Sequence, residues 1–315
     1  MLEIKKILVP SDFSPCSGQA LAHALALARR IDAEVHVLFA EVPYGEAYPK
    51  PADSAAADPL QAFLEQAGVE QGDAALDPAC FRIEHVVVRN VFVAPAILDY
   101  AVDHDIDLIV MGTHGRRNVE HLLLGSIAED IVRLAPCPVL TLRASKKPQP
   151  APTEVRSILV PVDFSEHARE ALRYARVLAA FFDARLDLLN VIEETLHPAF
   201  YGPGLQSVYD VIPDLDEKAE ERLRTFYWEA EGGAVSEVRF KALTGKVARV
   251  IAKYAAQEGT DLIVIATHGL TGLEHYFMGS VAERVVRRAP CPVFTVKSYG
   301  KSLLHRMGEA VAEVV

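Results

Sequence analysis

The chain has 315 residues, of which 50% are hydrophobic and 24% are charged, and its formal net charge is −11. One ordinary hydrophobic core does not organise so long a chain, so two folded domains are expected, and the hydrophobic content excludes intrinsic disorder. The negative charge, without a stripe of basic residues, argues against a general nucleic-acid binder, because neutralising phosphates requires a basic face.

The sequence also bears on location and metal content. No apolar run reaches the ~18 residues of a membrane span, and Met1 to Lys6 carries charge where a secretory signal is apolar, so a cytoplasmic protein is expected. Cys137 and Cys291 lie in matching Pro-Cys-Pro contexts, whereas Cys16 and Cys80 have no counterparts, which predicts four reduced thiols rather than disulfides. The cysteines and histidines show no spacing typical of structural zinc, so no metal site is predicted.

An internal repeat organises the chain. The segment ILVPSDFS at residues 7–14 recurs as ILVPVDFS at residues 158–165, an offset of 151. Two further segments recur at an offset of 154: THG at 113–115 and 267–269, and APCPV at 135–139 and 289–293. The offsets differ by only three residues, so two colinear units are predicted, with the length difference in their variable middles.

The proline-rich segment 146–152 lies between the units and disfavours both helix and central strand, which predicts a linker. The predicted divisions are domain 1 at residues 1–147, the linker at 148–152, domain 2 at 153–298, and a C-terminal helical tail at 299–315. In this tail, one apolar helical face is formed by Leu304, Met307, Val311 and Val314. This face is expected either to pack on its own domain or to bind a partner.

Short apolar runs alternate with helical patterns in each unit. The first run ends at Pro10, and the following helix is expected to be capped by Ser14 with Pro15 at its first position. The predicted strands are Ile7–Val9, Val35–Phe39, Ile83–Val88, Leu108–Met111 and Val139–Leu142, and then Ile158–Val160, Leu186–Val191, Val238–Lys241, Leu262–Ile265 and Val293–Val296. Continuous apolar strands separated by helices predict a parallel sheet covered on both faces, so each unit is expected to be a doubly wound α/β domain.

A glycine pattern follows the fourth predicted strand of the first unit. Residues 112–115 read GTHG, and Gly125 and Ser126 follow after nine residues. Backbone N–H groups of such a loop approach a ligand closely, and the positive end of the helix that begins near Gly125 favours an anion such as phosphate. Ligands of open α/β sheets bind beyond the carboxyl ends of the strands, so Asp12 is expected to face this loop if strands one and four are neighbours.

The opening ILVPSDFS, the loop GTHGR…GS and the closing APCPVLTL resemble the universal stress protein family, in both units and over nearly the whole chain. Members with this glycine pattern bind ATP. The resemblance implies two tandem five-stranded parallel sheets of strand order 3-2-1-4-5, the adenine-nucleotide alpha-hydrolase-like fold. It also implies an intramolecular pseudo-dimer through the last strands, 139–142 and 293–296, whose apolar edges are otherwise exposed. A further homodimer is left open.

The same resemblance implies a ligand and its contacts. The ligand is ATP, ADP or AMP, with Mg²⁺ held by the phosphates. Adenine and ribose contacts are implied near Pro10, Asp12 and Ala40, and sugar and phosphate contacts near Met111 and Gly112. Loop and helix contacts of the first unit are implied at His114, Gly115, Arg116, Gly125, Ser126 and Ile127. The second-unit set is Pro161, Asp163, Val191, Ala266, Gly269, Gly279, Ser280 and Val281.

Each of these residue types also has a purely structural interpretation. Ser126 and Ser280 are each followed three residues later by glutamate, so either serine could merely cap its helix. Asp12 and Asp163 could initiate turns before the following helix, a role compatible with ligand binding. His114 and His268 lack an accompanying nucleophile and orienting carboxylate in the local sequence, which favours loop-structural roles. Cys137 and Cys291 are expected to be inert, partly buried thiols.

These observations leave three functions open. The first is an adenine-nucleotide-binding stress-response or signalling protein that is not a metabolic enzyme. The second is a slow ATPase or nucleotidyl transferase, against which the chain shows neither a G-x₄-G-K-[ST] loop nor an H-x-G-H signature. The third is an interaction module with vestigial nucleotide sites.

The two units are expected to differ in strength, the first being the better triphosphate site. Arg116 and Arg117 follow its loop, whereas the second unit has Ala266 in place of the first glycine and no arginine there. One opposing signal is Gly245, which aligns with Val91 of the first unit and gives the second unit the more permissive backbone.

Overall fold

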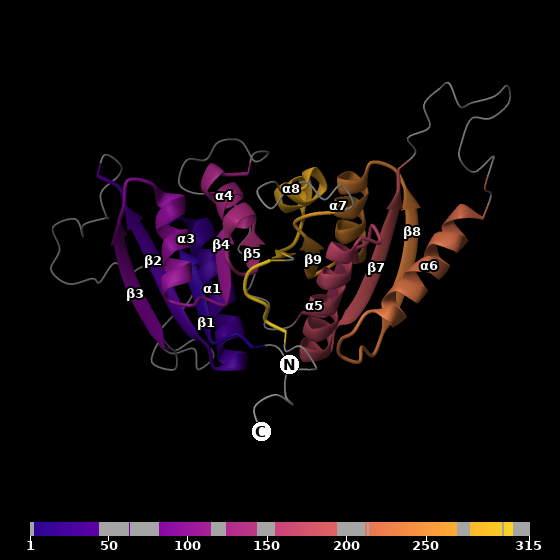
Figure 1. The fold of residues 1–315 in the computed structure, drawn as a ribbon, viewed down its shortest axis with the longest axis horizontal. Coiled ribbons are helices and arrows are strands. Elements are labelled where there is room, and N and C mark those ends of the chain that lie inside the picture. The colour runs from indigo at the N-terminus through magenta and orange to yellow at the C-terminus, as the bar shows by residue number, and fades with distance from the viewer. Residues whose placement is uncertain are drawn as a thin grey trace, which may run out of the picture.

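The computed structural model describes residues 3–43, 63, 82–114, 124–143, 155–193, 212, 214–269, 278–297 and 299–304. Within them the chain forms two α/β units side by side (Figure 1). The first unit contains β1 (Lys6–Pro10), α1 (Pro15–Ile31), β2 (Glu34–Glu41), β3 (Ile83–Arg89), α3 (Val93–Asp103), β4 (Leu108–Gly112), α4 (Ser126–Leu134) and β5 (Val139–Leu142). The second contains β6 (Ser157–Pro161), α5 (Glu166–Phe182), β7 (Arg185–Ile192), α6 (Leu215–Glu229), β8 (Val238–Thr244), α7 (Val247–Glu258), β9 (Leu262–Ala266), α8 (Ser280–Arg288) and β10 (Val293–Val296). Each predicted strand is present, with ends that differ by no more than a few residues.

The strands form one sheet of order β3-β2-β1-β4-β5-β10-β9-β6-β7-β8. The first five follow the expected order 3-2-1-4-5, and the second five repeat it in reverse across the molecule. Within each unit the paired strands are parallel. The expected fold of each unit is therefore confirmed, and the two sheets are continuous rather than separate.

Alternate strand residues face opposite sides of the sheet, as the pleat of a β-strand requires. Along β1, Ile7 and Val9 pack with the residues of α1, whereas Leu8 packs with those of α3 and α4. Helices α5 and α6 cover the same face as α1, and α7 and α8 cover the same face as α3 and α4. Burial on both faces explains why the strands read as continuous apolar runs.

The units join where β5 and β10 pair antiparallel, with Leu140 opposite Phe294. The Thr141 hydroxyl donates to the Val293 carbonyl oxygen at 3.2 Å, and the Thr295 hydroxyl donates to the Val139 carbonyl oxygen at 3.0 Å. The predicted pairing of the two last strands is confirmed. Because the pairing leaves neither strand as an edge, it removes a surface that favours aggregation.

Residues 299–304 cross back from the second unit to the first and lie in no helix. The Lys301 ammonium lies 2.6 Å from a carboxylate oxygen of Asp105 and 2.6 Å from one of Asp107, and the Lys301 amide donates to the Pro136 carbonyl oxygen at 2.7 Å. Gly300 has φ +86°, and an added Cβ would overlap that same carbonyl oxygen, so only glycine fits. This part of the predicted helical tail is instead a strap between units. Met307, Val311 and Val314, and the linker 148–152, lie outside the described residues.

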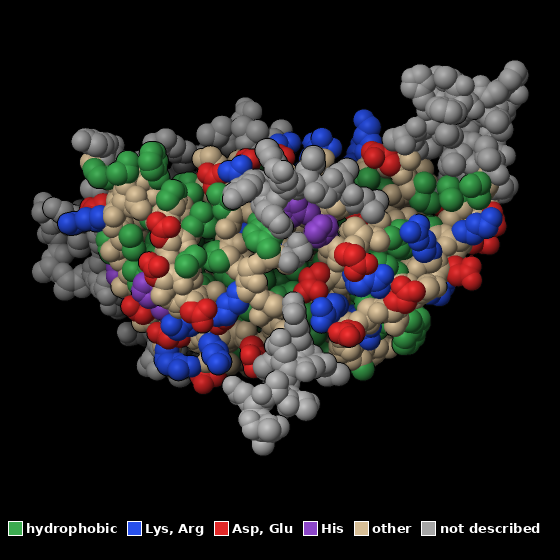
Figure 2. All heavy atoms as spheres, in the orientation of Figure 1, with side chains coloured by type: hydrophobic (Ala, Val, Ile, Leu, Met, Phe, Trp, Pro, Cys, Tyr) green, Lys and Arg blue, Asp and Glu red, His purple; other side chains and the backbone are tan. Residues whose placement is uncertain are grey.

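Acidic and basic side chains are interspersed over the face in Figure 2, with no basic stripe across it. No helix among the described residues is long and apolar enough to cross a membrane.

Candidate functional site

The first and fourth strands of each unit are neighbours: β1 pairs with β4, and β6 pairs with β9. These strands are parallel, so their carboxyl ends meet at one edge of the sheet. The strand that precedes Asp12 therefore lies beside the strand that precedes the glycine loop, as expected. Predicted site residues at this edge are Pro10, Ala40, Met111 and Gly112 in the first unit and Pro161, Val191 and Ala266 in the second.

The two aspartates shape the turn after the first strand of each unit. The backbone amide of Ser14 donates to Asp12 Oδ1 at 3.1 Å, and that of Ser165 donates to Asp163 Oδ1 at 3.0 Å. The Ser165 hydroxyl also donates to Asp163 Oδ1 at 2.6 Å. The turn-forming role is therefore real, and in the second unit it fixes one carboxylate oxygen by two hydrogen bonds.

The other carboxylate oxygen of Asp163 faces the glycine loop. A Cβ added to Gly269 would lie 2.6 Å from Asp163 Oδ2, closer than real Cβ contacts come. A side chain at residue 269 would therefore force the loop or the carboxylate to move. The corresponding Gly115, and Arg116 after it, lie outside the described residues, so their roles stay predictions.

The second half of the glycine pattern begins a helix in each unit. The N-cap of α4 is Gly125 and that of α8 is Gly279, and neither helix has a side-chain cap. Ser126 and Ser280 are the first helical residues and are exposed, so the capping interpretation of these serines is wrong. Their hydroxyls are therefore not needed to cap the helix.

Hydrogen bonds hold each helix start against the loop. The Gly125 amide donates to the Thr113 carbonyl oxygen at 3.0 Å, and the Gly279 amide donates to that of Thr267 at 2.7 Å. An added Cβ at either glycine would lie 3.1 Å from the same oxygen. Exposed Ile127 and half-buried Val281 follow in the first turn of α4 and α8. The positive end of the helix thus lies next to the loop. This arrangement favours the binding of an anion between them.

The histidines of the loops form the same local contact in both units. His114 Nδ1 lies 2.9 Å from the Thr113 hydroxyl oxygen, and His268 Nδ1 lies 3.0 Å from that of Thr267. This repeated bond supports the loop-structural interpretation.

Cys16, in the first turn of α1, packs against the first glycine of the loop in the first unit. A Cβ at Gly112 would lie 2.5 Å from Cys16 Sγ, so glycine is required there by the neighbouring helix. In the second unit His167 follows the helix cap at the matching distance, and Ala266 replaces the glycine. Gly112 therefore has a packing reason of its own, and the expected difference in strength between the two sites stays a prediction.

The described cysteines are free and buried. Burial raises the pKa of Cys137 and of Cys291 to about 12, and it raises that of Cys16 despite hydrogen bonds from the loop backbone. Thiols that stay protonated are poor nucleophiles, so the expectation of inert Cys137 and Cys291 is supported.

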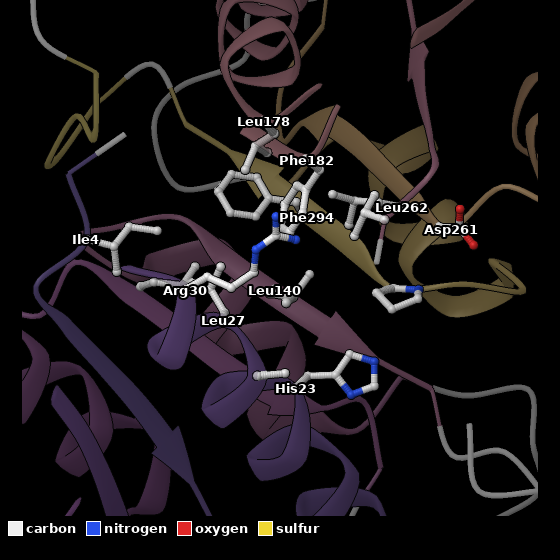
Figure 3. A pocket seen from close by; sticks show the side chains of 14 residues that line it. Ile4, His23, Leu27, Arg30, Leu140, Leu178, Phe182, Asp261, Leu262 and Phe294 are labelled. Carbon is white, nitrogen blue, oxygen red and sulfur yellow. The ribbon is translucent and has the colours of Figure 1, made fainter. Parts of the chain in front are cut away.

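A separate apolar cavity of ≈ 50 Å³ lies between the units (Figure 3). Its walls include Leu27, Leu140 and Phe294, and the Arg30 guanidinium lies 4.9 Å from the centre of the Phe182 ring. Leu108 and Leu262, also in the walls, begin β4 and β9. The cavity thus lies at the amino ends of these strands, away from the glycine loops, and takes no part in the candidate site.

Comparisons with known proteins agree with this architecture. The profile described as "Universal stress protein family" matches residues 3–143 and again 154–297. The universal stress protein MJ0531 of Methanocaldococcus jannaschii is 35% identical over 143 residues, which are 45% of this chain and 82% of that protein.

Two solved structures resemble the whole chain. A universal stress protein from Archaeoglobus fulgidus has a TM-score of 0.59 at 20% identity, covering 93% of this chain and 98% of its own. PA1789 of Pseudomonas aeruginosa has a TM-score of 0.64 at 18% identity, covering 93% and 92%. These likenesses show a shared fold, and the two profile matches show that the chain belongs to the universal stress protein family as a tandem member with two family domains.

Proposed function

We propose that the chain binds ATP or a related adenine nucleotide at the carboxyl edge of each unit, and that it acts in stress response or signalling rather than in metabolism. The observation that carries the proposal is the close approach of the glycine loop to Asp163, where a Cβ on residue 269 would lie 2.6 Å from Asp163 Oδ2. The start of α8 is tied to the same loop by the Gly279 amide. A carboxylate suited to ribose hydroxyls and a helix end suited to phosphates thus share one site.

The described residues fit such a ligand. Gly125 and Gly279 bring no side chain to the helix starts, and Ser126 and Ser280 are exposed beside them. When bound, the nucleotide brings its own phosphates as ligands for Mg²⁺, while the chain supplies the carboxylate, the backbone amides and the hydroxyls. The hydrogen bonds between the loop histidines and their neighbouring threonines favour a structural role for these histidines, and so binding without turnover.

Asp163→Asn tests the proposal in the second unit. Asparagine retains an oxygen that accepts from the Ser165 amide, so the turn persists, but it removes the negative charge that faces the loop. A hydrogen bond to a charged group contributes about 1.5–3 kcal/mol, so nucleotide affinity at this site should fall about tenfold or more. Calorimetric titration of the full chain with ATP and Mg²⁺ measures the change.

Ser165→Ala is the matched control, because it removes the helix cap and the hydroxyl partner of Asp163 but leaves the carboxylate. It should lower the free energy of unfolding by about 1 kcal/mol and largely retain ATP affinity. If Asp163→Asn binds ATP as tightly as the wild-type chain, Asp163 does not contact the nucleotide.

A further inference from the structure

Three side chains of the first unit gather at the amino ends of β2 and β3, away from the glycine loops. His36 on β2 lies directly opposite Glu84 on β3, and Glu34 lies two residues before His36, on the same face of the strand. One potential ligand atom from each of the three lies within 4.8 Å of the other two. The side chain of His36 is 2% exposed, whereas Glu34 and Glu84 are 34% and 52% exposed.

The buried imidazole has a carboxylate beside each ring nitrogen but a hydrogen bond at only one of them. His36 Nδ1 lies 2.7 Å from the Tyr100 hydroxyl oxygen and 3.6 Å from Glu84 Oε2. His36 Nε2 is buried and has no hydrogen-bond partner among the described residues. It lies 3.6 Å from Glu34 Oε1, which is too long for a hydrogen bond. Two ligand atoms of a tetrahedral Zn²⁺ ion lie about 3.3 Å apart, since each is ~2.0–2.1 Å from the metal. The spacing is therefore near that of two ligands of one cation.

The second unit provides an internal comparison, because the same places there hold a different set. Asp187 corresponds to His36, and Arg239 lies opposite it in the sheet register. Arg185 corresponds to Glu34, and its guanidinium bonds Asp187 at 3.0 Å. The second unit thus neutralises its buried carboxylate with its own arginine.

The first unit lacks that compensation. Among the described residues, no lysine or arginine forms an ion pair with Glu34 or Glu84. Lys6 is nearby, but its ammonium donates to the His104 carbonyl oxygen at 3.0 Å. In the first unit, two carboxylates and an imidazole converge. In the second unit, the corresponding positions hold an arginine paired with an aspartate.

We propose that Glu34, His36 and Glu84 bind one divalent transition-metal ion of the zinc class, and that Tyr100 is a positioning residue for His36. Two carboxylates balance the charge of the ion, and an imidazole ligand favours Zn²⁺ over Mg²⁺ or Ca²⁺, which prefer oxygen ligands. The hydrogen bond at Nδ1 fixes the ring and leaves Nε2 for the metal. Glu34 already lies beside Nε2, whereas Glu84 Oε2 lies 3.6 Å from Nδ1, so the half-exposed Glu84 side chain must rotate to reach the ion. The rings of His104 and Tyr100 stack with their centres 3.7 Å apart, next to the site.

The test is a titration of the full chain with Zn²⁺ in competition with a chromophoric chelator, after removal of bound metal and without nucleotide. One equivalent of Zn²⁺ should bind, and Glu84→Gln should weaken that binding about tenfold or more. Tyr100→Phe should weaken it about 10- to 100-fold without removing a ligand, as loss of an outer hydrogen bond does in other metal sites. Co²⁺ in place of Zn²⁺ should give visible absorption bands that His36→Gln abolishes.

Glu237→Gln is the matched control. Glu237 is a half-exposed carboxylate beside Arg239 in the second unit, and its loss should leave Zn²⁺ affinity unchanged. Because Glu84 is half-exposed, Glu84→Gln should fold even if His36→Gln does not. The proposal is overturned if the wild-type chain binds no single equivalent of Zn²⁺, or if Glu84→Gln binds it as tightly as the wild type.

Discussion

Gly269→Val should remove nucleotide binding from the second unit and leave binding by the first unit intact. The valine Cβ would lie 2.6 Å from Asp163 Oδ2, so either the loop or the carboxylate must move. The carboxylate cannot rotate freely, because two hydrogen bonds from Ser165 hold its other oxygen. Overpacking of this kind costs about 1–3 kcal/mol, which corresponds to a loss of affinity of up to about 100-fold. Calorimetric titration should show the number of ATP molecules per chain falling from two to one.

Gly259→Asn is the matched control for a lost glycine. Gly259 is the C-cap of α7 with φ +63°, a conformation that asparagine tolerates, and an added Cβ there meets no atom within 4 Å. This variant should bind two ATP molecules per chain. Unchanged binding by Gly269→Val would show that the loop near Asp163 is not a nucleotide site.

The second large effect concerns Lys297, a buried lysine at the boundary of the two units. Its ammonium donates to the Ala135 carbonyl oxygen of the first unit at 2.6 Å, and burial lowers its pKa from 10.5 to about 7. Between pH 7 and 10.5 the unfolded chain therefore binds more protons at this residue than the folded chain does. Stability must rise with pH across this window, and the gain is lost as pH falls towards 7.

Lys297→Met should abolish this contribution, because methionine fills similar space and carries no charge. Between pH 7 and pH 10, the free energy of unfolding of the wild-type chain should rise by roughly 3 kcal/mol more than that of the variant. Denaturant unfolding of both chains at the two pH values measures the difference, and the contributions of other groups cancel in it. Parallel pH profiles would mean that Lys297 is charged in the folded chain.

The sequence predicted the strands, their order and the joint between the units because each follows from local apolar runs and one topological rule. The meeting of Asp163 and the Gly269 loop could be predicted for the same reason. Parallel strands bring their carboxyl ends together whatever the intervening helices contain.

The sequence did not reveal two kinds of feature at the site: contacts between residues that are distant in the chain, and a helix capped by a glycine. The S-x-x-E pattern suggested Ser126 as a helix cap, but Gly125 takes that position. The glycine at residue 112 is explained by Cys16, a contact that only the packed helix reveals. The strap at 299–304 depends likewise on Pro136 and Asp107, which lie more than 150 residues earlier in the chain.

The register between the second and third strands of each unit corrects one sequence alignment and brings together one pair of residues. Glu41 pairs with Arg89 and Ile192 pairs with Thr244, so the residue after the third strand is Asn90 in one unit and Gly245 in the other. The sequence alignment of Gly245 with Val91 is therefore displaced by one residue at the strand end. The same register unites His36 with Glu84, a pair that no short motif spacing reveals.

The most direct test of adenine-nucleotide binding is calorimetric titration of the full wild-type chain with ATP in the presence of Mg²⁺. Saturable binding should approach two nucleotides per chain, one for each unit. Absence of saturable binding of ATP, ADP and AMP at millimolar concentrations would contradict the proposed function.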